Sequence, residues 1–155
     1  TRTLESGLHD SLEHLAERID FDAGTLYGYS KRSKHLTPLA EFGGGVNFID
    51  RVKFDHGRGL SAYAVKKQHT IYLQDIHRGS RHGHAPVRSY ISLPILEDAD
   101  VLGVLNLAHI EPHAFERPTM AVIRTYADGL KPILTIFQRH QYAIRARQQN
   151  SFTRR

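Results

Sequence analysis

The chain contains no cysteine and no tryptophan, and it has a single methionine among its 155 residues. The lack of cysteine excludes disulfide bonds, thiolate zinc sites, iron–sulfur clusters and cysteine nucleophiles. No apolar run approaches the roughly 20 residues that a membrane-spanning helix needs, and no segment resembles a secretory signal. These absences predict a cytoplasmic protein without membrane contact. The chain length predicts one domain with a core of its own.

Acidic residues are also in short supply, with 16 against 21 basic residues and a formal net charge of +5. The excess lies in residues 139–155, which hold five arginines and no acid, so the first 138 residues carry sixteen charges of each sign. Nucleic-acid-binding domains usually present a basic face on the fold itself. The distribution therefore predicts a neutral domain over residues 1–138 that binds no nucleic acid. Residues 139–155 are predicted to form a basic helical tail toward a further domain, or alternatively an electrostatic binding arm.

Apolar residues recur at helical spacing near both ends of the chain. The first stripe repeats every three or four residues, through Leu4, Leu8, Leu12, Leu15 and Ile19. The second stripe alternates spacings of four and three, through Ile123, Ala127, Leu130, Leu134, Phe137, Gln141 and Ile144. Each stripe predicts an amphipathic helix. Pro132 lies inside the second one and is expected to bend it or to remove a backbone hydrogen bond.

The segments between these helices have the composition of strands and turns. Residues 25–29 and 36–42 predict two strands, and residues 61–67 a short helix. Residues 89–96 and 101–110 are apolar runs that flank a polar turn, which predicts an antiparallel hairpin. A further strand is predicted at residues 70–73 and a long loop at residues 75–87. The short connections favour an α+β fold with a mainly antiparallel sheet.

Six of these pieces, in their order and spacing, resemble the GAF family of small-molecule sensor domains over residues 4–138. They are Gly24 to Tyr29, the Gly57-Arg58-Gly59-Leu60 turn with its helix, Ile71 to Asp75, Arg88 to Ile95, Leu102 to Leu107, and Phe115 with the final helix. The resemblance implies a six-stranded antiparallel sheet with the terminal helices packed on one face. It implies a ligand pocket on the other face, under the middle helix and the long loop.

Several activities of GAF relatives do not fit this sequence. Bilin attachment and the reduction of free methionine sulfoxide both depend on cysteines in the family, and the chain has none. The signature of the cyclic-nucleotide-binding members is not recognisable as an ordered set. Ser61, Ser89 and Ser92 are not spaced with His and Asp in an acyl-transfer motif, so the domain is predicted to be non-catalytic.

Histidines crowd the predicted loop, where His77, His82 and His84 lie among Arg78 and Arg81. Their spacing matches no metal-ligand template and the arginines disfavour a cation, so we predict neither a metal nor another cofactor. A haem- or metal-binding sensor is the less favoured alternative. The cluster could instead hold an anion, with Arg88 as a fork-shaped donor.

The function predicted from these features is a regulatory sensor that binds a small molecule and signals to an attached output domain through its last helix. The pocket is predicted to be bordered by Phe42, Phe48, Tyr63, Tyr72, Asp75, Arg88, Tyr90, Ser92 and Asn106. On the strand at residues 89–95, Tyr90 and Ser92 share one face, and Ile91, Leu93 and Ile95 suit the face toward the helices. A ligand-free dimerisation or spacer module is the alternative function.

A homodimer through the terminal helices is also expected. The sheet can cover one side of each helix, and Phe137 and Ile144 lie far along the last one from Pro118 at a rise of about 1.5 Å per residue. We expect this seam to pack across a two-fold axis.

Overall fold

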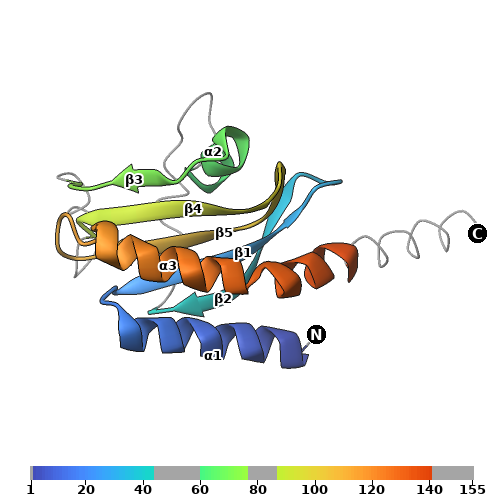
Figure 1. Cartoon of the computed structure of the whole chain (residues 1–155), viewed down its shortest axis with the longest axis horizontal. Helices are drawn as coiled ribbons and strands as arrows, with labels where there is room; N and C mark the ends of the chain where they lie inside the picture. Colours follow the sequence, from blue (N-terminus) through green and yellow to red (C-terminus); the bar gives the residue numbers. More distant parts are fainter. Residues whose placement is uncertain (1, 44–59, 77–86, 141–155) are drawn as a thin grey trace, which may run out of the picture.

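A computed structural model describes residues 2–43, 60–76 and 87–140 of the chain (Figure 1). Its elements follow one another as α1 (Arg2–Arg18), β1 (Ala23–Ser30), β2 (His35–Phe42), α2 (Leu60–Lys67), β3 (Ile71–Leu73), β4 (Ser89–Glu97), β5 (Asp100–His109) and α3 (Arg117–Gly129). The predicted strands and the first two predicted helices are therefore confirmed to within a few residues, whereas most of the predicted loop at residues 75–87 lies outside the described residues. None of the helices in the described ranges has the length and apolar character needed to cross a bilayer.

The strands form one antiparallel sheet in the order β2-β1-β5-β4-β3 (Figure 1). Six strands were expected, and the described part of the chain contains five. The β4–β5 hairpin lies at the centre of the fold, and its strands pair from Ser89↔His109 to Glu97↔Asp100. Both strands are buried along most of their length, which explains why they are apolar almost throughout.

One face of the sheet is covered by α1 and α3. The main core cluster joins their stripes, including Leu8, Leu12 and Ile123, to side chains of the strands such as Ile91 and Leu105. Figure 1 shows α3 lying over the sheet, roughly along the direction of β5, and α1 alongside β2. The predicted packing of Ile91, Leu93 and Ile95 toward the helices is confirmed.

The last helix is interrupted where Pro132 predicts a disturbance. α3 ends at Gly129, Leu130 forms a turn, and helical backbone resumes over residues 131–140. The N–H of Leu130 reaches back three residues to the carbonyl of Ala127 at 3.1 Å. Proline has no N–H to donate, so the break next to it costs the helix little.

Phe137, which was expected to lie in an exposed dimer seam, lies inside the domain. Phe137 is 7% exposed and packs inside the domain, where a Cβ added to Gly28 would lie 2.4 Å from its ring. Leu134 similarly covers Gly103, the strand partner of Gly28. Two glycines facing the helix let residues 131–140 approach the sheet closely. The inference that Phe137 projects beyond the domain was wrong. Ile144 and most of the predicted tail lie outside the described residues.

Candidate functional site

The face of the sheet opposite α1 and α3 carries a row of buried polar side chains. Directly paired residues in antiparallel strands point to the same face, and Asn106 on β5 pairs with both Thr25 on β1 and Ser92 on β4. All three residues are 0% exposed. Their sequence neighbours Leu105 and Leu107 point the other way, into the helix-covered core. The row therefore lies in the interior, on the α2 side of the sheet.

Hydrogen bonds connect this row to α2. The hydroxyl of Ser92 donates to Oδ1 of Asn106 at 2.8 Å, and Nδ2 of Asn106 donates to Oγ of Ser61 at 2.7 Å. Ser61 lies in the first turn of α2 and is 4% exposed. Burying such groups costs free energy unless they are bonded. The connected arrangement fixes where α2 lies on the sheet.

An ion pair stands at the end of the sheet where β3 stops and β4 starts. Nε of Arg88 donates to Oδ1 of Asp75 at 3.0 Å, and a terminal nitrogen of the same guanidinium reaches the same oxygen. The side chains are 33% and 29% exposed, so both reach solvent. Next to them, Tyr90 is fully buried in a small cluster with Leu60 of α2. Charged, hydroxyl and aromatic groups thus meet beside the buried polar row.

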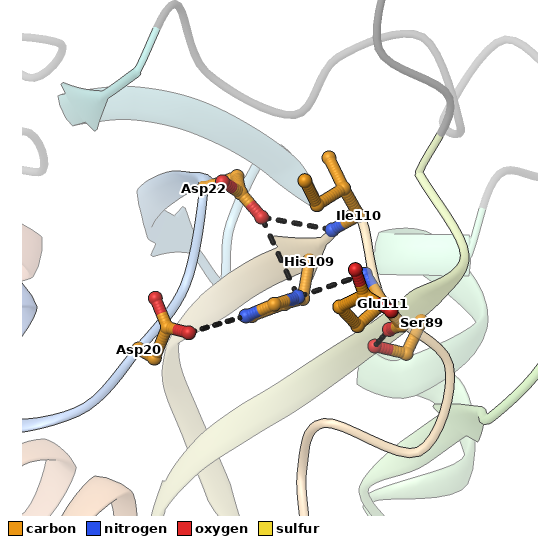
Figure 2. A network of polar contacts seen from close by, with 6 residues as sticks. All are labelled: Asp20, Asp22, Ser89, His109, Ile110 and Glu111. Carbon is orange, nitrogen blue, oxygen red and sulfur yellow. Dashed lines mark hydrogen bonds and ion pairs between the residues drawn. The ribbon is translucent and has the colours of Figure 1, made fainter.

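Figure 2 shows a polar network around His109, at this same end of the sheet. The ring is 8% exposed; Nε2 lies 2.9 Å from Oδ2 of Asp20, and Nδ1 accepts the N–H of Glu111 at 2.9 Å. Acceptance at Nδ1 places the proton of the neutral ring on Nε2, where it donates to Asp20. Asp22 accepts the N–H of Ile110 at 2.8 Å. The network joins the segment between α1 and β1 to the segment that leads into α3.

Further bonds extend the network to β3 and β4. The N–H of Arg88 donates to the carbonyl of His109 at 2.9 Å, and the hydroxyl of Ser89 donates to the carbonyl of Glu111 at 2.7 Å. His113 donates its N–H to the carbonyl of Gln74 at 2.8 Å. The ion-paired residue Arg88 is therefore one hydrogen bond away from the backbone of His109.

The structure brings together five of the nine predicted pocket residues: Asp75, Arg88, Tyr90, Ser92 and Asn106. Tyr63 lies on α2, with the ammonium of Lys67 5.7 Å from its ring centroid. Phe48 lies outside the described residues, as do His77, His82 and His84. Whether any of these residues binds a ligand stays a prediction.

The placement of Phe42 and Tyr72 in that pocket was wrong. Both point to the helix-covered face: Phe42 packs edge-on against Phe21 with ring centroids 5.1 Å apart, and Tyr72 accepts a hydrogen bond of 2.8 Å from Arg124 of α3. Tyr72 borders a groove of about 730 Å³ between β3 and the start of α3. The aromatic character of a strand residue does not disclose its face, which depends on register.

Sequence reasoning missed the His109 network. Asp20 and His109 are 89 residues apart and match no local motif. The one available signal was the position of His109 at the end of a mostly apolar strand. Among the described residues, no three His, Asp or Glu side chains are grouped as a metal ion would require.

The sequence matches the profile of the GAF domain over residues 1–134. A search of curated proteins gives no match. The fold is similar to the GAF domain of a phosphoenolpyruvate-protein phosphotransferase from Coxiella burnetii, with a TM-score of 0.69 and 22% identity over 90% of this chain and 86% of that one. The corresponding Acinetobacter domain gives a TM-score of 0.68 at 18% identity, over 91% and 85% of the two chains.

A third similar structure is an enzyme, the type II free methionine-R-sulfoxide reductase from Thermoplasma acidophilum. It has a TM-score of 0.65 and 19% identity, with 88% of this chain and 95% of that chain covered. At such identities the structural likeness shows the fold alone. The profile covers most of the sequence and agrees with the architecture. This chain belongs to the GAF domain family.

Proposed function

We propose that this chain is a non-catalytic sensor domain that binds a small polar molecule on the α2 side of its sheet and passes the binding signal to its terminal helices. GAF domains are commonly small-molecule-binding regulatory domains. The observation that carries the proposal is the shared end of the sheet, where the Asp75–Arg88 pair and the His109 network meet.

The proposed site offers charged groups to which a polar molecule can bind. Arg88 presents a planar donor fork and Asp75 a carboxylate, and both are partly open to solvent. A ligand carrying an acidic or amide group can compete for either partner. Ser92 and Asn106 are fully buried and bonded to each other and to Ser61, so their part is to hold α2 in place beside this ion pair.

The proposed signalling depends on the His109 network, which connects the segment after α1 with the segment before α3. The backbone N–H of Arg88 donates to the carbonyl of His109, and the ring of His109 is bonded to Asp20, two residues beyond the end of α1. Glu111 donates to the same ring and precedes α3. A ligand that displaces Arg88 therefore acts on contacts that hold the junctions of both terminal helices. The ratio of the ligand's affinities for the domain with these contacts intact and with them changed sets how far the balance between the two conformations shifts.

A thermal-shift screen with a panel of amino acids, nucleotides and dicarboxylates tests the binding step. A ligand at 100 times its Kd stabilises the folded state by about 2.7 kcal/mol, which raises Tm by roughly 5–10 °C in a domain of this size. Arg88→Gln should abolish the shift, whereas the matched variant Arg124→Gln on the helix side should retain it. Equal shifts in both variants would contradict the site.

Hydrogen exchange tests the signalling step with any ligand so found. We expect slower or faster exchange at the amides of residues 20–22 and 110–116 when the ligand is added to the wild type. His109→Ala should retain binding and lose this distant response. A response confined to residues around Arg88 would mean binding without transmission.

A second candidate function, homodimerisation, is favoured by Ile136. This side chain lies on the helical segment at residues 131–140 and is 58% exposed, whereas its neighbour Phe137 is buried. Light scattering at micromolar concentration should give a dimer for the wild type and a monomer for Ile136→Glu. A monomeric wild type would remove this candidate and leave the sensor proposal unaffected.

A further inference from the structure

The groove that Tyr72 borders lies on the helix-covered face, between β3 and the first half of α3, and its volume is about 730 Å³. Figure 1 shows this part of α3 beside β3, the last strand of the sheet. Sites for small molecules usually enclose about 300–1,000 Å³. Neither Asp75 nor Arg88, both within the described residues, borders this groove. It is therefore a second hollow, separate from the proposed sensor site.

One side of α3 forms the long wall of the groove. The residues of this helix that border it are Arg117, Met120, Ala121 and Arg124. Their spacings of three, one and three residues place them on the same side of the helix. Arg117 and Arg124 stand about 10 Å apart along the axis, at a rise of about 1.5 Å per residue. The groove is therefore elongated, with an arginine toward each end of this wall.

Hydrogen-bond donors converge at the Arg124 end of the groove. A terminal nitrogen of Arg124 donates to the hydroxyl of Tyr72 at 2.8 Å, which uses one of the N–H groups of the guanidinium and leaves the phenolic proton available. Within the described ranges this guanidinium has no carboxylate partner. The acid one turn further along α3, Asp128, is paired with Lys131 at 3.1 Å. A guanidinium fork beside a hydroxyl is a donor arrangement that suits a carboxylate.

The other end of the groove carries charges of both signs. Glu116 and Arg117 are neighbours in the sequence and both border it, so their charges offset each other. His113 faces Gln74 there, with Nδ1 3.0 Å from Oε1. Glu116 precedes Arg124 by eight residues, about 12 Å along the axis, which exceeds the screening length of about 8 Å at physiological salt. A single anionic group is therefore favoured at the Arg124 end.

We propose that this groove binds a small organic carboxylate with an elongated apolar body. The carboxylate accepts hydrogen bonds from Arg124 and from the hydroxyl of Tyr72. The body covers Ala121 and the ring of Tyr72, which is 39% exposed, and rests on a floor of Phe115 and Met120, which are 9% and 6% exposed. Removing this apolar surface from water adds to the affinity that the carboxylate supplies. Occupancy of the groove does not depend on the proposed sensor function.

Isothermal titration of the domain with 4-phenylbutyrate tests the proposal. We expect binding that weakens as the salt concentration is raised. The affinity should exceed that of acetate, which lacks the apolar body, and that of 4-phenylbutyramide, which lacks the charge, by at least about fivefold. Arg124→Gln should weaken binding about tenfold and Tyr72→Phe about threefold, because each removes a hydrogen bond to a charged group. Both side chains are exposed, so the fold should be preserved, which circular dichroism checks.

Arg139→Gln is the matched control. Arg139 is an exposed arginine on the helical residues 131–140 that follow α3, and it does not border the groove. The affinity of this variant for 4-phenylbutyrate should stay within about twofold of the wild type. Equal losses in Arg139→Gln and Arg124→Gln would overturn the proposal, as would no binding to the wild type at millimolar concentration. Equal affinity for 4-phenylbutyramide would overturn the carboxylate, and equal affinity for acetate would overturn the apolar body.

Arg88→Gln separates this proposal from the sensor proposal. It should leave the affinity for 4-phenylbutyrate unchanged, whereas a ligand of the sensor site should be lost in Arg88→Gln and retained in Arg124→Gln. Loss of 4-phenylbutyrate binding in Arg88→Gln with retention in Arg124→Gln would place the probe at the Asp75–Arg88 pair and overturn the groove as its site. Failure of the groove to bind the probe would leave the thermal-shift test of the sensor site unaffected.

Discussion

At the centre of the sheet, the two faces both bury their side chains but differ in chemistry. On the helix side the strands present Leu26, Leu105 and Ile91, all within a core of hydrocarbon. On the α2 side the same strands present Thr25, Asn106 and Ser92 at 0% exposure. Apolar burial stabilises without regard to direction, whereas buried hydrogen bonds stabilise only when each partner is in place. The first face can therefore supply most of the stability, and the second can specify how α2 lies on the sheet.

The largest effect is expected from placing a polar side chain on the apolar face. Leu105→Asn removes a fully buried side chain and leaves an amide without partners, which should lower the free energy of unfolding by about 5 kcal/mol. Urea unfolding followed by circular dichroism measures the loss. Ile110→Asn is the control, because Ile110 is 40% exposed and should change stability by less than about 1 kcal/mol. A loss below 2 kcal/mol in Leu105→Asn would contradict the contrast between the faces.

The close approach of the last helix to the sheet provides the second test. Gly28→Ala would place a Cβ 2.4 Å from the ring of Phe137, so we expect a loss of about 3 kcal/mol from overpacking. Gly7→Ala is the matched substitution, because a Cβ at Gly7 on α1 meets nothing within 4 Å. It should stabilise the domain by about 0.5–1 kcal/mol through helix propensity. Similar effects at both glycines would show that the helix does not pack over Gly28.

The polar face is tested by removing the centre of its network. Asn106→Ala leaves the hydroxyls of Ser92 and Ser61 without this partner and should cost about 2 kcal/mol. Ser61→Ala alone should cost about 1 kcal/mol. The double variant should cost less than the two losses added together, with a coupling near 1 kcal/mol. Strict additivity in thermal unfolding would show that Asn106 and Ser61 do not act together.

The elements of the fold were predictable because their signals are local. The hairpin of β4 and β5 shows as two apolar runs around a polar turn, and the break near Pro132 follows from a missing N–H. The position of Phe137 was not predictable, because it depends on Gly28, a residue more than 100 positions away in the sequence. A periodic stripe shows that a helix face is buried and does not say against what.

The candidate site was predictable only where strand alternation applies. Alternation correctly placed Ser92 and Tyr90 on one face and Ile91 on the other. It could not place Phe42 or Tyr72, which lie near the ends of separate strands whose register comes from pairing. The contacts of His109 with Asp20 and Asp22 arise where distant segments meet, so no spacing in the sequence indicates them.

The smallest effect is expected at a polar contact on the helix side, where Tyr126 of α3 meets Ser11 of α1. The phenol oxygen lies 2.8 Å from Oγ of Ser11. Burial raises the pKa of Tyr126, and the contact with Ser11 opposes this with a smaller effect. The folded state therefore keeps the phenolic proton more tightly than the unfolded chain, whose tyrosines ionise near pH 10. The resulting stability is fully present below about pH 10 and is lost as the pH rises through the folded-state pKa.

The fall of the Tyr126 contribution with rising pH distinguishes Tyr126→Phe from the loss of an ordinary contact, whose effect on stability would not change with pH. At pH 8 the variant should be about 1 kcal/mol less stable than the wild type, because it lacks the hydroxyl. As the pH rises above 10 the wild type alone loses the contribution of Tyr126, so the difference in urea unfolding should narrow. Ser11→Ala removes the opposing contact and leaves the burial, so the pKa of Tyr126 should rise further in an absorbance titration of phenolate. A stability difference that stays constant between pH 8 and about pH 11 would show that burial on this face does not hold the proton.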